Sequence, residues 1–329
     1  MAEIDLVCPW VDGSDPAWRA ERDRYASALE RKQTVMWRDW GLMRYWFRGV
    51  ERALPWVHRI YFVTWGHLPP WLNEAHQKLR VVRHTDYIPE AYLPTFSALT
   101  IGLNAHRIPG LSEQFIYTND DCFFLDYMEK EAFFQNGLPC DYLHIRPITE
   151  LRAAGFGHIL WNNLACLNEH FSLAACMEKN AAHWFHPSYP EKNRKDNEMA
   201  RRLTRFPGFA NPHLPQPMLR STYEEVWEKA YDRLHCACKE RFRSSSGYVE
   251  WLMRDWQLAA GRFTPYMREG VGVEINGAKE TIRDALLSTR NRVVCLNEGS
   301  GNVDFVSRRA YLQSLFERVL PEKSAFEKE

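Results

Sequence analysis

IDLVCPWVDGSDP, which runs from Ile4 to Pro16, is the stretch of sequence that decides the fold. Its apolar part, Ile4 to Val11, predicts a short buried β-strand. The strand ends in a polar turn, where Asp15 is a favourable N-cap and Pro16 a favourable first residue of a helix. A strand, a polar turn and a helix in this order are the start of an alternating α/β fold.

The same alternation continues along the first half of the chain. Helices are predicted at Arg38–Leu54, whose apolar residues recur every three or four positions, and at Thr95–Arg107. Strands are predicted at Arg59–Thr64, Leu79–Arg83 and Gln114–Thr118. Strands that alternate with helices predict a mostly parallel, Rossmann-like sheet flanked by helices.

The second half of the sequence is more helical. Helices are predicted at Ser221–Lys239, Val249–Gly261 and Val303–Leu320, with one late strand at Val293–Leu296. The charged stretch Glu191–Arg205 is interpreted as a solvated helix face. A chain of 329 residues fits one large α/β domain or two small ones.

Composition limits the class of protein. Lys plus Arg and Asp plus Glu each number 42, and a chain without net charge is a poor binder of nucleic acids in general. The sequence has no basic leader and no run of roughly 18 apolar residues, so we expect a cytoplasmic protein without a transmembrane segment. The 13 tryptophans fit either a packed core or a sugar-binding surface.

The eight cysteines are scattered along the sequence. They contain no pair of C-x-x-C motifs, so a zinc knuckle is not expected. Scattered cysteines in a long chain are typical of reduced thiols in the cytoplasm.

Polar residues follow each predicted strand of the first half. Asn119-Asp120-Asp121 comes directly after an apolar strand, and Asp12-Gly13 after the first one. Ligands of open parallel sheets bind beyond the carboxyl ends of the strands. Asp120 and Asp121 are therefore candidate ligands of a hard cation such as Mg²⁺, the alternative being a simple Asx turn.

Two further segments contain residues suited to chemistry on phosphates. His213 lies in the proline-rich segment NPHLPQP, which holds it stiffly, so it is either a catalytic imidazole or an ordinary surface histidine. Arg241 and Arg243 would share one face of an extended segment and could clamp a pyrophosphate, unless they lie at a solvated helix end.

Several motifs, in order along nearly the whole chain, resemble the Stealth family of hexose-1-phosphate transferases of capsular polysaccharide synthesis, which are related to the lysosomal-enzyme GlcNAc-1-phosphotransferase. The first region of the family resembles Ile4–Pro16, and the second runs from Arg38-Asp39-Trp40 to Asn119-Asp120-Asp121. The third resembles residues 211–215 with Arg241-Phe242-Arg243, and the fourth resembles Cys295-Leu296-Asn297 with residues 321–324.

The resemblance implies a glycosyltransferase-A-like fold and an enzyme that moves hexose-1-phosphate, including N-acetylhexosamine-1-phosphate, from a UDP-sugar to a hydroxyl of a saccharide or polysaccharide acceptor, with release of UMP. It implies a Mg²⁺ or Mn²⁺ cofactor and, at most, peripheral association with the capsule machinery at the membrane. The site residues that it implies are catalytic His213, Asp121 and Arg243, metal-binding Asp120 and Asp121, and nucleotide-sugar-binding Trp10, Asp12, Gly13, Arg241 and Asn297.

The expected organisation is a single catalytic domain over residues 1–329. Residues 1–150 would form the α/β half that holds the nucleotide-sugar and the metal. Residues 151–290 would form a mainly helical part with the His/Arg loop, and residues 291–329 a strand and a helix that complete the domain.

The sequence departs from the family pattern at a few positions. Where relatives are expected to carry Glu, this chain has Gly102, and where Asp is expected it has Gly247 and Glu298. The alternatives are a metal-dependent glycosyltransferase, which would release UDP, and a catalytically silent nucleotide-sugar-binding protein. His213 could take the acceptor's proton or attack phosphorus itself, and the sequence does not separate these roles.

Overall fold

The computed structural model describes residues 2–32, 37–149, 156–299, 301 and 303–328. Within these residues no helix combines the length and the apolar character needed to cross a membrane. The boundary predicted near residue 150 lies outside the described residues. The strands are β1 (Ile4–Pro9), β2 (Ile60–Thr64), β3 (Leu79–Arg83), β4 (Gln114–Tyr117), β5 (Cys122–Phe124), β6 (Phe134–Gln135), β7 (Leu138–Asp141), β8 (Gln216–Leu219), β9 (Thr264–Pro265), β10 (Val271–Glu274) and β11 (Val293–Asn297).

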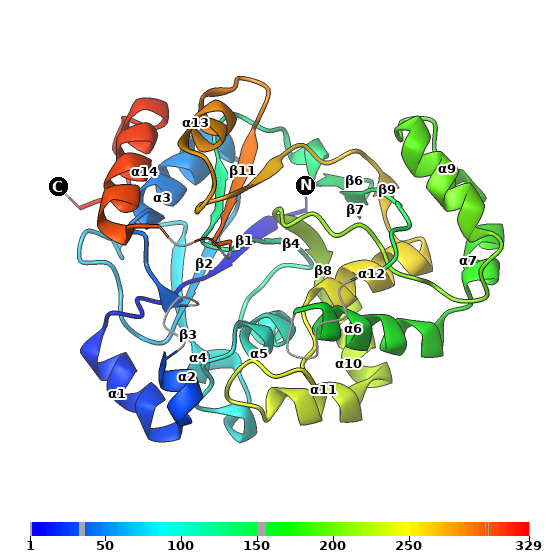
Figure 1. The fold of residues 1–329 in the computed structure, drawn as a ribbon, viewed down its shortest axis with the longest axis horizontal. Helices are drawn as coiled ribbons and strands as arrows, with labels where there is room; N and C mark the ends of the chain where they lie inside the picture. The colour runs from blue at the N-terminus through cyan, green and yellow to red at the C-terminus, as the bar shows by residue number, and fades with distance from the viewer. Residues whose placement is uncertain (1, 33–36, 150–155, 300, 302, 329) are drawn as a thin grey trace.

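Helices surround these strands on several sides (Figure 1). They are α1 (Pro16–Tyr25), α2 (Ala28–Lys32), α3 (Met43–Ala53), α4 (His84–Tyr87), α5 (Ala98–Leu103), α6 (Phe156–His170), α7 (Leu173–Lys179), α8 (Ala181–Trp184), α9 (Glu191–Ala200), α10 (Arg220–Lys229), α11 (Tyr231–Cys238), α12 (Trp251–Ala260), α13 (Lys279–Leu287) and α14 (Phe305–Val319). Short 3₁₀ helices are present at Glu90–Tyr92, Ala105–Arg107 and Lys130–Ala132.

The main sheet has five strands in the order β3-β2-β1-β4-β8. The first four are parallel to one another, and β8 is antiparallel to β4 at the edge. The predicted α/β fold with a mostly parallel, Rossmann-like sheet flanked by helices is therefore confirmed. Two smaller sheets, β10-β11-β5 and β6-β7-β9, were not foreseen as sheets, because their strands are short and most carry no alternating pattern.

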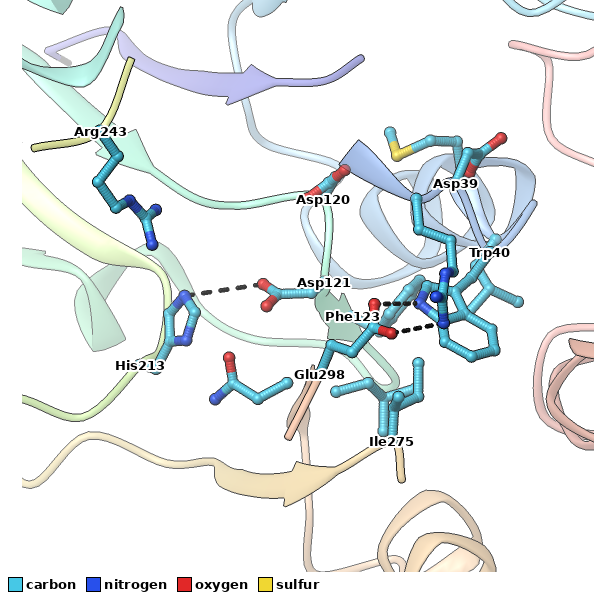
Figure 2. A pocket seen from close by; sticks show the side chains of 14 residues that line it. Asp39, Trp40, Asp120, Asp121, Phe123, His213, Arg243, Ile275 and Glu298 are labelled. Atoms are coloured by element: carbon cyan, nitrogen blue, oxygen red, sulfur yellow. Dashed lines mark hydrogen bonds and ion pairs between the residues drawn. The ribbon is translucent and has the colours of Figure 1, made fainter. Parts of the chain in front are cut away.

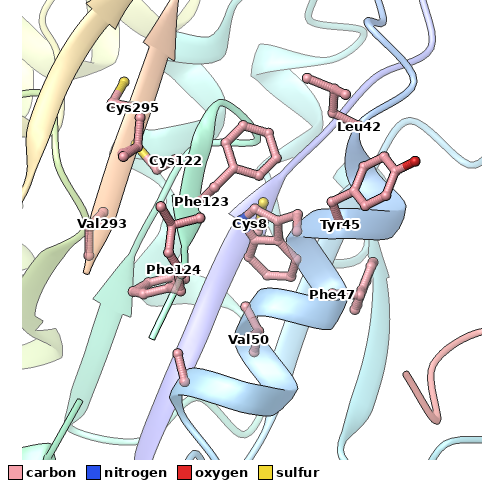
Figure 3. Close-up of a cluster of buried hydrophobic side chains, with 14 of the residues drawn as sticks. Cys8, Leu42, Tyr45, Phe47, Val50, Cys122, Phe123, Phe124, Val293 and Cys295 are labelled. Atoms are coloured by element: carbon pink, nitrogen blue, oxygen red, sulfur yellow. The ribbon is translucent and has the colours of Figure 1, made fainter. Parts of the chain in front are cut away.

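The central strand β1 is buried on both faces. Leu6 and Cys8 point into a hydrophobic cluster with α3, α13 and α14, whereas Val7 points into a second cluster with α5, α10 and α12. Successive side chains of a strand alternate between faces, so one apolar run supplies both cores. Figure 3 shows Cys8 between α3, which carries Phe47 and Val50, and β5.

Three predicted helices differ from the observed ones. The helix expected at Arg38–Leu54 begins only at Met43, because Gly41 takes a left-handed conformation (φ 68°) and its N–H donates to the Asp39 carboxylate at 2.8 Å. The helix expected at Thr95–Arg107 begins at Ala98, since the N–H of Phe96 is bonded to the carbonyl of Arg241. The helix expected at Ser221–Lys239 is divided into α10 and α11 at Ala230.

A buried ion pair joins α12 to β7. Arg254, with a fully buried side chain, donates Nε and Nη2 to the two carboxylate oxygens of Asp141 at 2.7 and 2.9 Å. Its third nitrogen, Nη1, donates to the Ala210 carbonyl at 3.1 Å and to the side chain of Asn211. Arg254 therefore joins α12, β7 and residues 210–211 at one point. Residues 210–211 lead directly to His213.

Replacing Asp141 with Asn is expected to lower the free energy of unfolding by about 3–5 kcal/mol, because it leaves the buried guanidinium of Arg254 without its counter-ion. Urea unfolding of both proteins measures the difference. Asp126→Asn, at a carboxylate that is 60% exposed, is the matched control and should change it by less than about 0.5 kcal/mol. Equal losses in the two variants would contradict the role of the pair.

The same pair sets the pH range of this contribution. Burial raises the pKa of Asp141, but Arg254 and Arg268 outweigh it and hold the pKa below the usual range. A carboxyl group whose pKa is lower in the folded state stabilises the fold fully above about pH 4, its unfolded-state pKa. This stabilisation is lost as the pH falls through the folded-state pKa. The gap in stability between the wild type and Asp141→Asn should therefore narrow below about pH 4.

Candidate active site

A cavity of about 330 Å³, called here the first cavity, opens beyond the carboxyl ends of β4 and β11. It is lined by residues that are far apart in the sequence, and Figure 2 shows them converging. Arg243 and His213 lie on one side of Asp121 in this view, and Asp39 and Trp40 on the other. The polar residues in the lining are Arg38, Asp39, Asp120, Asp121, His213, Arg243, Asn297 and Glu298.

Three aspartates face the first cavity, and a fourth carboxylate in its lining, Glu298, is paired with Arg38. Asp120 and Asp121 follow β4, as predicted, and Asp39 comes from the turn before α3. The carboxylate of Asp120 is accessible from the cavity yet surrounded by protein. This burial, together with the charges of Asp121 and Asp39, raises its pKa to about 8. A concentration of negative charge on oxygen ligands fits a hard divalent cation such as Mg²⁺ or Mn²⁺.

His213 is oriented by polar neighbours on different segments. Its Nε2 lies 2.6 Å from the side-chain amide of Asn119 and 3.8 Å from Oδ1 of Asp121. Burial lowers the pKa of His213, but hydrogen bonding to Cys295 and the charge of Asp121 outweigh it and raise the pKa to about 10. The raised pKa favours the imidazolium form of His213, in which Nε2 would donate to the amide oxygen of Asn119.

Two thiols extend this polar group into a second possible metal-binding set. Asp121, Cys122, His213 and Cys295 each offer a ligand atom, and these atoms lie within 4.8 Å of one another. Sulfur, imidazole and carboxylate together are a set that suits Zn²⁺ better than Mg²⁺. Cys122 and Cys295 face each other on the antiparallel strands β5 and β11, so no local spacing in the sequence announced the set.

The two arginines predicted to act together are separated in the structure. Arg243 lines the first cavity, with its guanidinium 5.7 Å from the ring of Phe156. Arg241 is exposed, packs on Tyr25 at 4.7 Å and lies outside the lining. The geometry thus supports Arg243 as a phosphate ligand and adds nothing for Arg241.

Trp10 and Asp12 line a neighbouring cavity of about 440 Å³, called the third cavity, which shares Asp39 with the first. The Asp12 carboxylate accepts hydrogen bonds from the N–H and hydroxyl of Ser14, and its backbone N–H donates to His67. Gly13 packs so tightly on residue 37 that a Cβ would lie 2.1 Å from the carbonyl oxygen of that residue. Glycine is therefore required there by contact with the chain itself.

Another cavity, called the second cavity, lies on the far side of His213 and Arg243 and has a volume of about 370 Å³. It shares His213, Arg243, Asn297 and Glu298 with the first cavity. Its remaining lining is mostly apolar or aromatic, with one buried acid: Ala98, Leu99, Tyr117, Asn119, Phe156, Val249, Glu250 and Trp251.

Sequence reasoning missed several lining residues. Arg38 and Asp39 were assigned to a helix, but they lie outside it, and Arg38 forms an ion pair with Glu298 at 2.8 Å. Trp40 also donates to Glu298, at 3.2 Å. Glu298 stands where the family pattern predicted the shorter Asp. Its contacts with Arg38 and Trp40 fix the position of the longer side chain. At Gly247 a Cβ would lie 2.6 Å from the terminal methyl Cδ1 of Leu99 and 3.1 Å from the carbonyl oxygen of Ser244, so a side chain there requires Leu99 to shift.

Comparisons with known proteins identify the class to which this fold and site belong. A model of conserved region 1 of Stealth proteins matches residues 3–30, and a model of conserved region 2 matches residues 36–140. The chain therefore belongs to the Stealth family, as its motifs predicted.

Relatives similar over the full chain are named as polysaccharide phosphotransferases. The capsular polysaccharide phosphotransferase WcwK of Streptococcus pneumoniae is 36% identical, covering 99% of both chains. The receptor polysaccharide phosphotransferase WefC of Streptococcus oralis is 35% identical, covering 99% of this chain and all of the relative. The exopolysaccharide phosphotransferase cps2G of Lactiplantibacillus plantarum is 33% identical, covering 99% of this chain and 96% of the relative.

Asp121→Asn is expected to weaken Mn²⁺ binding roughly tenfold or more, because a hard cation loses a charged oxygen ligand. Isothermal titration of the purified protein measures the dissociation constant. Cys295→Ser is the comparison variant and should leave Mn²⁺ binding within twofold of the wild type. Loss of binding in Cys295→Ser with retention in Asp121→Asn would instead place the ion among the thiols.

Proposed function

We propose that the protein transfers hexose-1-phosphate from a UDP-sugar to a hydroxyl of a saccharide acceptor and releases UMP, in the synthesis of a capsular or other surface polysaccharide. The relatives named as capsular, receptor and exopolysaccharide phosphotransferases support the reaction class. The observation that carries the proposal is the first cavity, in which three aspartates face His213 and Arg243, apart from the ion pair of Arg38 with Glu298. Such a cavity can hold a cation-bound diphosphate between opposite charges.

The diphosphate would lie between the two groups of charges. Asp120 and Asp121, with Asp39, would hold Mg²⁺ or Mn²⁺, which supplies positive charge to stabilise the charge on the phosphates. From the other side Arg243 would donate hydrogen bonds to phosphate oxygens. Positioning and charge stabilisation of this kind account for most of the catalysis of phosphoryl transfer.

His213 would complete the positive side of the site. Its raised pKa keeps the imidazole protonated, which suits donation of a hydrogen bond to the phosphate next to the sugar. Direct attack on phosphorus would require loss of that proton first. Asn297, at the end of β11, hydrogen-bonds His213 and would fix the plane of the ring.

The nucleotide would extend into the third cavity. Trp10 and Asp12 line it, and its shared residue Asp39 connects it to the diphosphate site. Gly13 would contribute by its close packing, whereas Arg241 packs on Tyr25 outside the lining of the three cavities and has no assigned role in this arrangement.

We place the reaction in the cytoplasm, because each of the eight cysteines, all within the described residues, is a free thiol, as is usual in that reducing compartment.

The nucleotide released from the donor distinguishes this function from its alternatives. Purified protein with Mg²⁺ is incubated with UDP-glucose, UDP-galactose and UDP-N-acetylglucosamine, and the products are identified by mass spectrometry. We expect UMP, and we expect His213→Ala to lower its rate of formation by about 10²–10⁴-fold. His186→Ala, at a histidine outside the three cavities, is the matched control and should keep the wild-type rate.

Each other outcome contradicts the proposal in a different way. UDP in place of UMP would identify a conventional metal-dependent glycosyltransferase. Release of neither nucleotide, with retained binding of the donor, would identify a nucleotide-sugar-binding protein without activity. A normal rate in His213→Ala would remove the histidine from the mechanism while leaving the reaction class intact.

A further inference from the structure

The second cavity contains a carboxylate at the place where this chain lacks a side chain. A Cβ built on Gly102 of α5 would lie 2.9 Å from Oε2 of Glu250 and 2.9 Å from the hydroxyl of Tyr117. The carboxylate of Glu250, from the start of α12, therefore fills the space that a side chain at position 102 would enter.

The position of Glu250 is fixed by both of its neighbouring segments. Val249, just before it, exchanges hydrogen bonds with Asn163 of α6 at 3.1 and 3.2 Å. Four residues after it, Arg254 is locked to Asp141. A carboxylate held this way at the N-terminal end of a helix is favoured by the helix dipole.

Glu250 is the acid of the second cavity that is free to act on a ligand. Of the two glutamates in the described lining, Glu298 is already paired with Arg38 and Trp40. Glu250 is only 6% exposed and faces the cavity beside Tyr117, Arg243 and His213. Burial raises its pKa to about 7, although the charges of His213 and Arg243 favour its ionised form. A base with such a pKa is suited to proton transfer near neutral pH.

The remaining lining of the second cavity fits a saccharide. Phe156 and Trp251 form an edge-to-face pair with their rings 5.6 Å apart, and Trp251 lies 6.0 Å from His213. Flat aromatic rings with a few polar groups are the usual lining of a small-molecule site, and they can cover the apolar faces of a sugar. Since His213 and Arg243 border both cavities, a molecule here would meet a diphosphate in the first cavity at these two residues.

We propose that the second cavity binds the acceptor saccharide and that Glu250 is the base that takes the proton of its reacting hydroxyl. The acceptor oxygen forms a bond to the phosphorus next to the sugar as its O–H bond breaks and the proton passes to Glu250. The bond from this phosphorus to the bridging oxygen breaks, and UMP leaves with the electron pair. This inference rests on the proposed function, whose donor occupies the first cavity.

Glu250→Gln is expected to lower UMP formation by about 100-fold or more, because it removes the base and keeps the shape of the side chain. The assay uses the three UDP-sugars above, with the methyl glycosides of glucose, galactose and N-acetylglucosamine, or water alone, as acceptors. Binding of UDP, measured by titration, should stay within twofold of the wild type, because the donor lies in the first cavity. Glu240→Gln, at an exposed acid outside the cavities, is the control and should keep the wild-type rate.

Moving the carboxylate tests its position directly. Gly102 lies inside α5 without a left-handed conformation, so Glu fits there once the side chain of Glu250 is removed and the Tyr117 hydroxyl, also 2.9 Å from the Cβ, shifts slightly. The double variant Gly102→Glu with Glu250→Ala is expected to form UMP at least tenfold faster than Glu250→Ala alone. A merely structural role of Glu250 would give no such rescue. A wild-type rate in Glu250→Gln would overturn the proposal.

A binding measurement keeps this inference separable from the proposed function. The methyl glycosides are titrated against the intrinsic tryptophan fluorescence of the wild type, of Glu250→Ala and of Trp251→Phe. We expect saturable binding to the wild type, weakened at least fivefold by Glu250→Ala, and a smaller signal in Trp251→Phe. If wild-type protein forms no UMP but binds the glycosides in this way, the reaction is wrong and the saccharide cavity stands. Absence of saccharide binding to the wild type would overturn the acceptor cavity.

Discussion

The buried pair between Arg254 and Asp141 is the constraint on which the arrangement of the site depends. A guanidinium removed from water is stable only when its hydrogen-bonding groups are occupied, and Arg254 satisfies them with Asp141, Ala210 and Asn211. The strand β7, the helix α12 and the segment before His213 therefore meet at one point. Two residues beyond Asn211 stands His213, and four residues before Arg254 stands Glu250, so this one pair positions groups that face both cavities.

The first and second cavities share part of their lining, and the shared part includes two basic side chains. His213, Arg243, Asn297 and Glu298 belong to the lining of both, whereas the three aspartates belong only to the first and Glu250 only to the second. Acids on both sides of these basic side chains suit the transfer of a phosphoryl group between two substrates. In the proposed reaction one set of acids would hold a cation on the donor, and Glu250 would remove a proton from the acceptor. In this proposal the distribution of charge places the donor in the first cavity and the acceptor in the second.

The sequence predicts well those features that depend on local order. The parallel sheet follows from apolar runs separated by helices. Asp12 and Asp121 could be placed at the site because the carboxyl ends of parallel strands meet at one edge of the sheet. The position of Asp39 was not predictable in the same way, since the predicted helix included it, whereas the left-handed Gly41 delays the start of α3 to Met43. Glu250 has no local signal at all, because its role depends on the missing side chain of Gly102 in another helix. For Arg241 the i, i+2 spacing predicted a face shared with Arg243, but only Arg243 lines the first cavity and Arg241 packs on Tyr25, because such spacing joins two side chains only where the backbone is regular.

The central claim is that the bond broken lies between the two phosphates of the donor and not between phosphate and sugar. A UDP-sugar with ³²P in the phosphate next to the sugar tests it directly, since that phosphorus travels with the sugar in one case and with the nucleotide in the other. After reaction with Mg²⁺ and a saccharide acceptor, the products are separated by chromatography. The proposed chemistry predicts ³²P in the saccharide product, in a phosphodiester, with unlabelled UMP. Label recovered in UDP, with an unlabelled saccharide product, would contradict it.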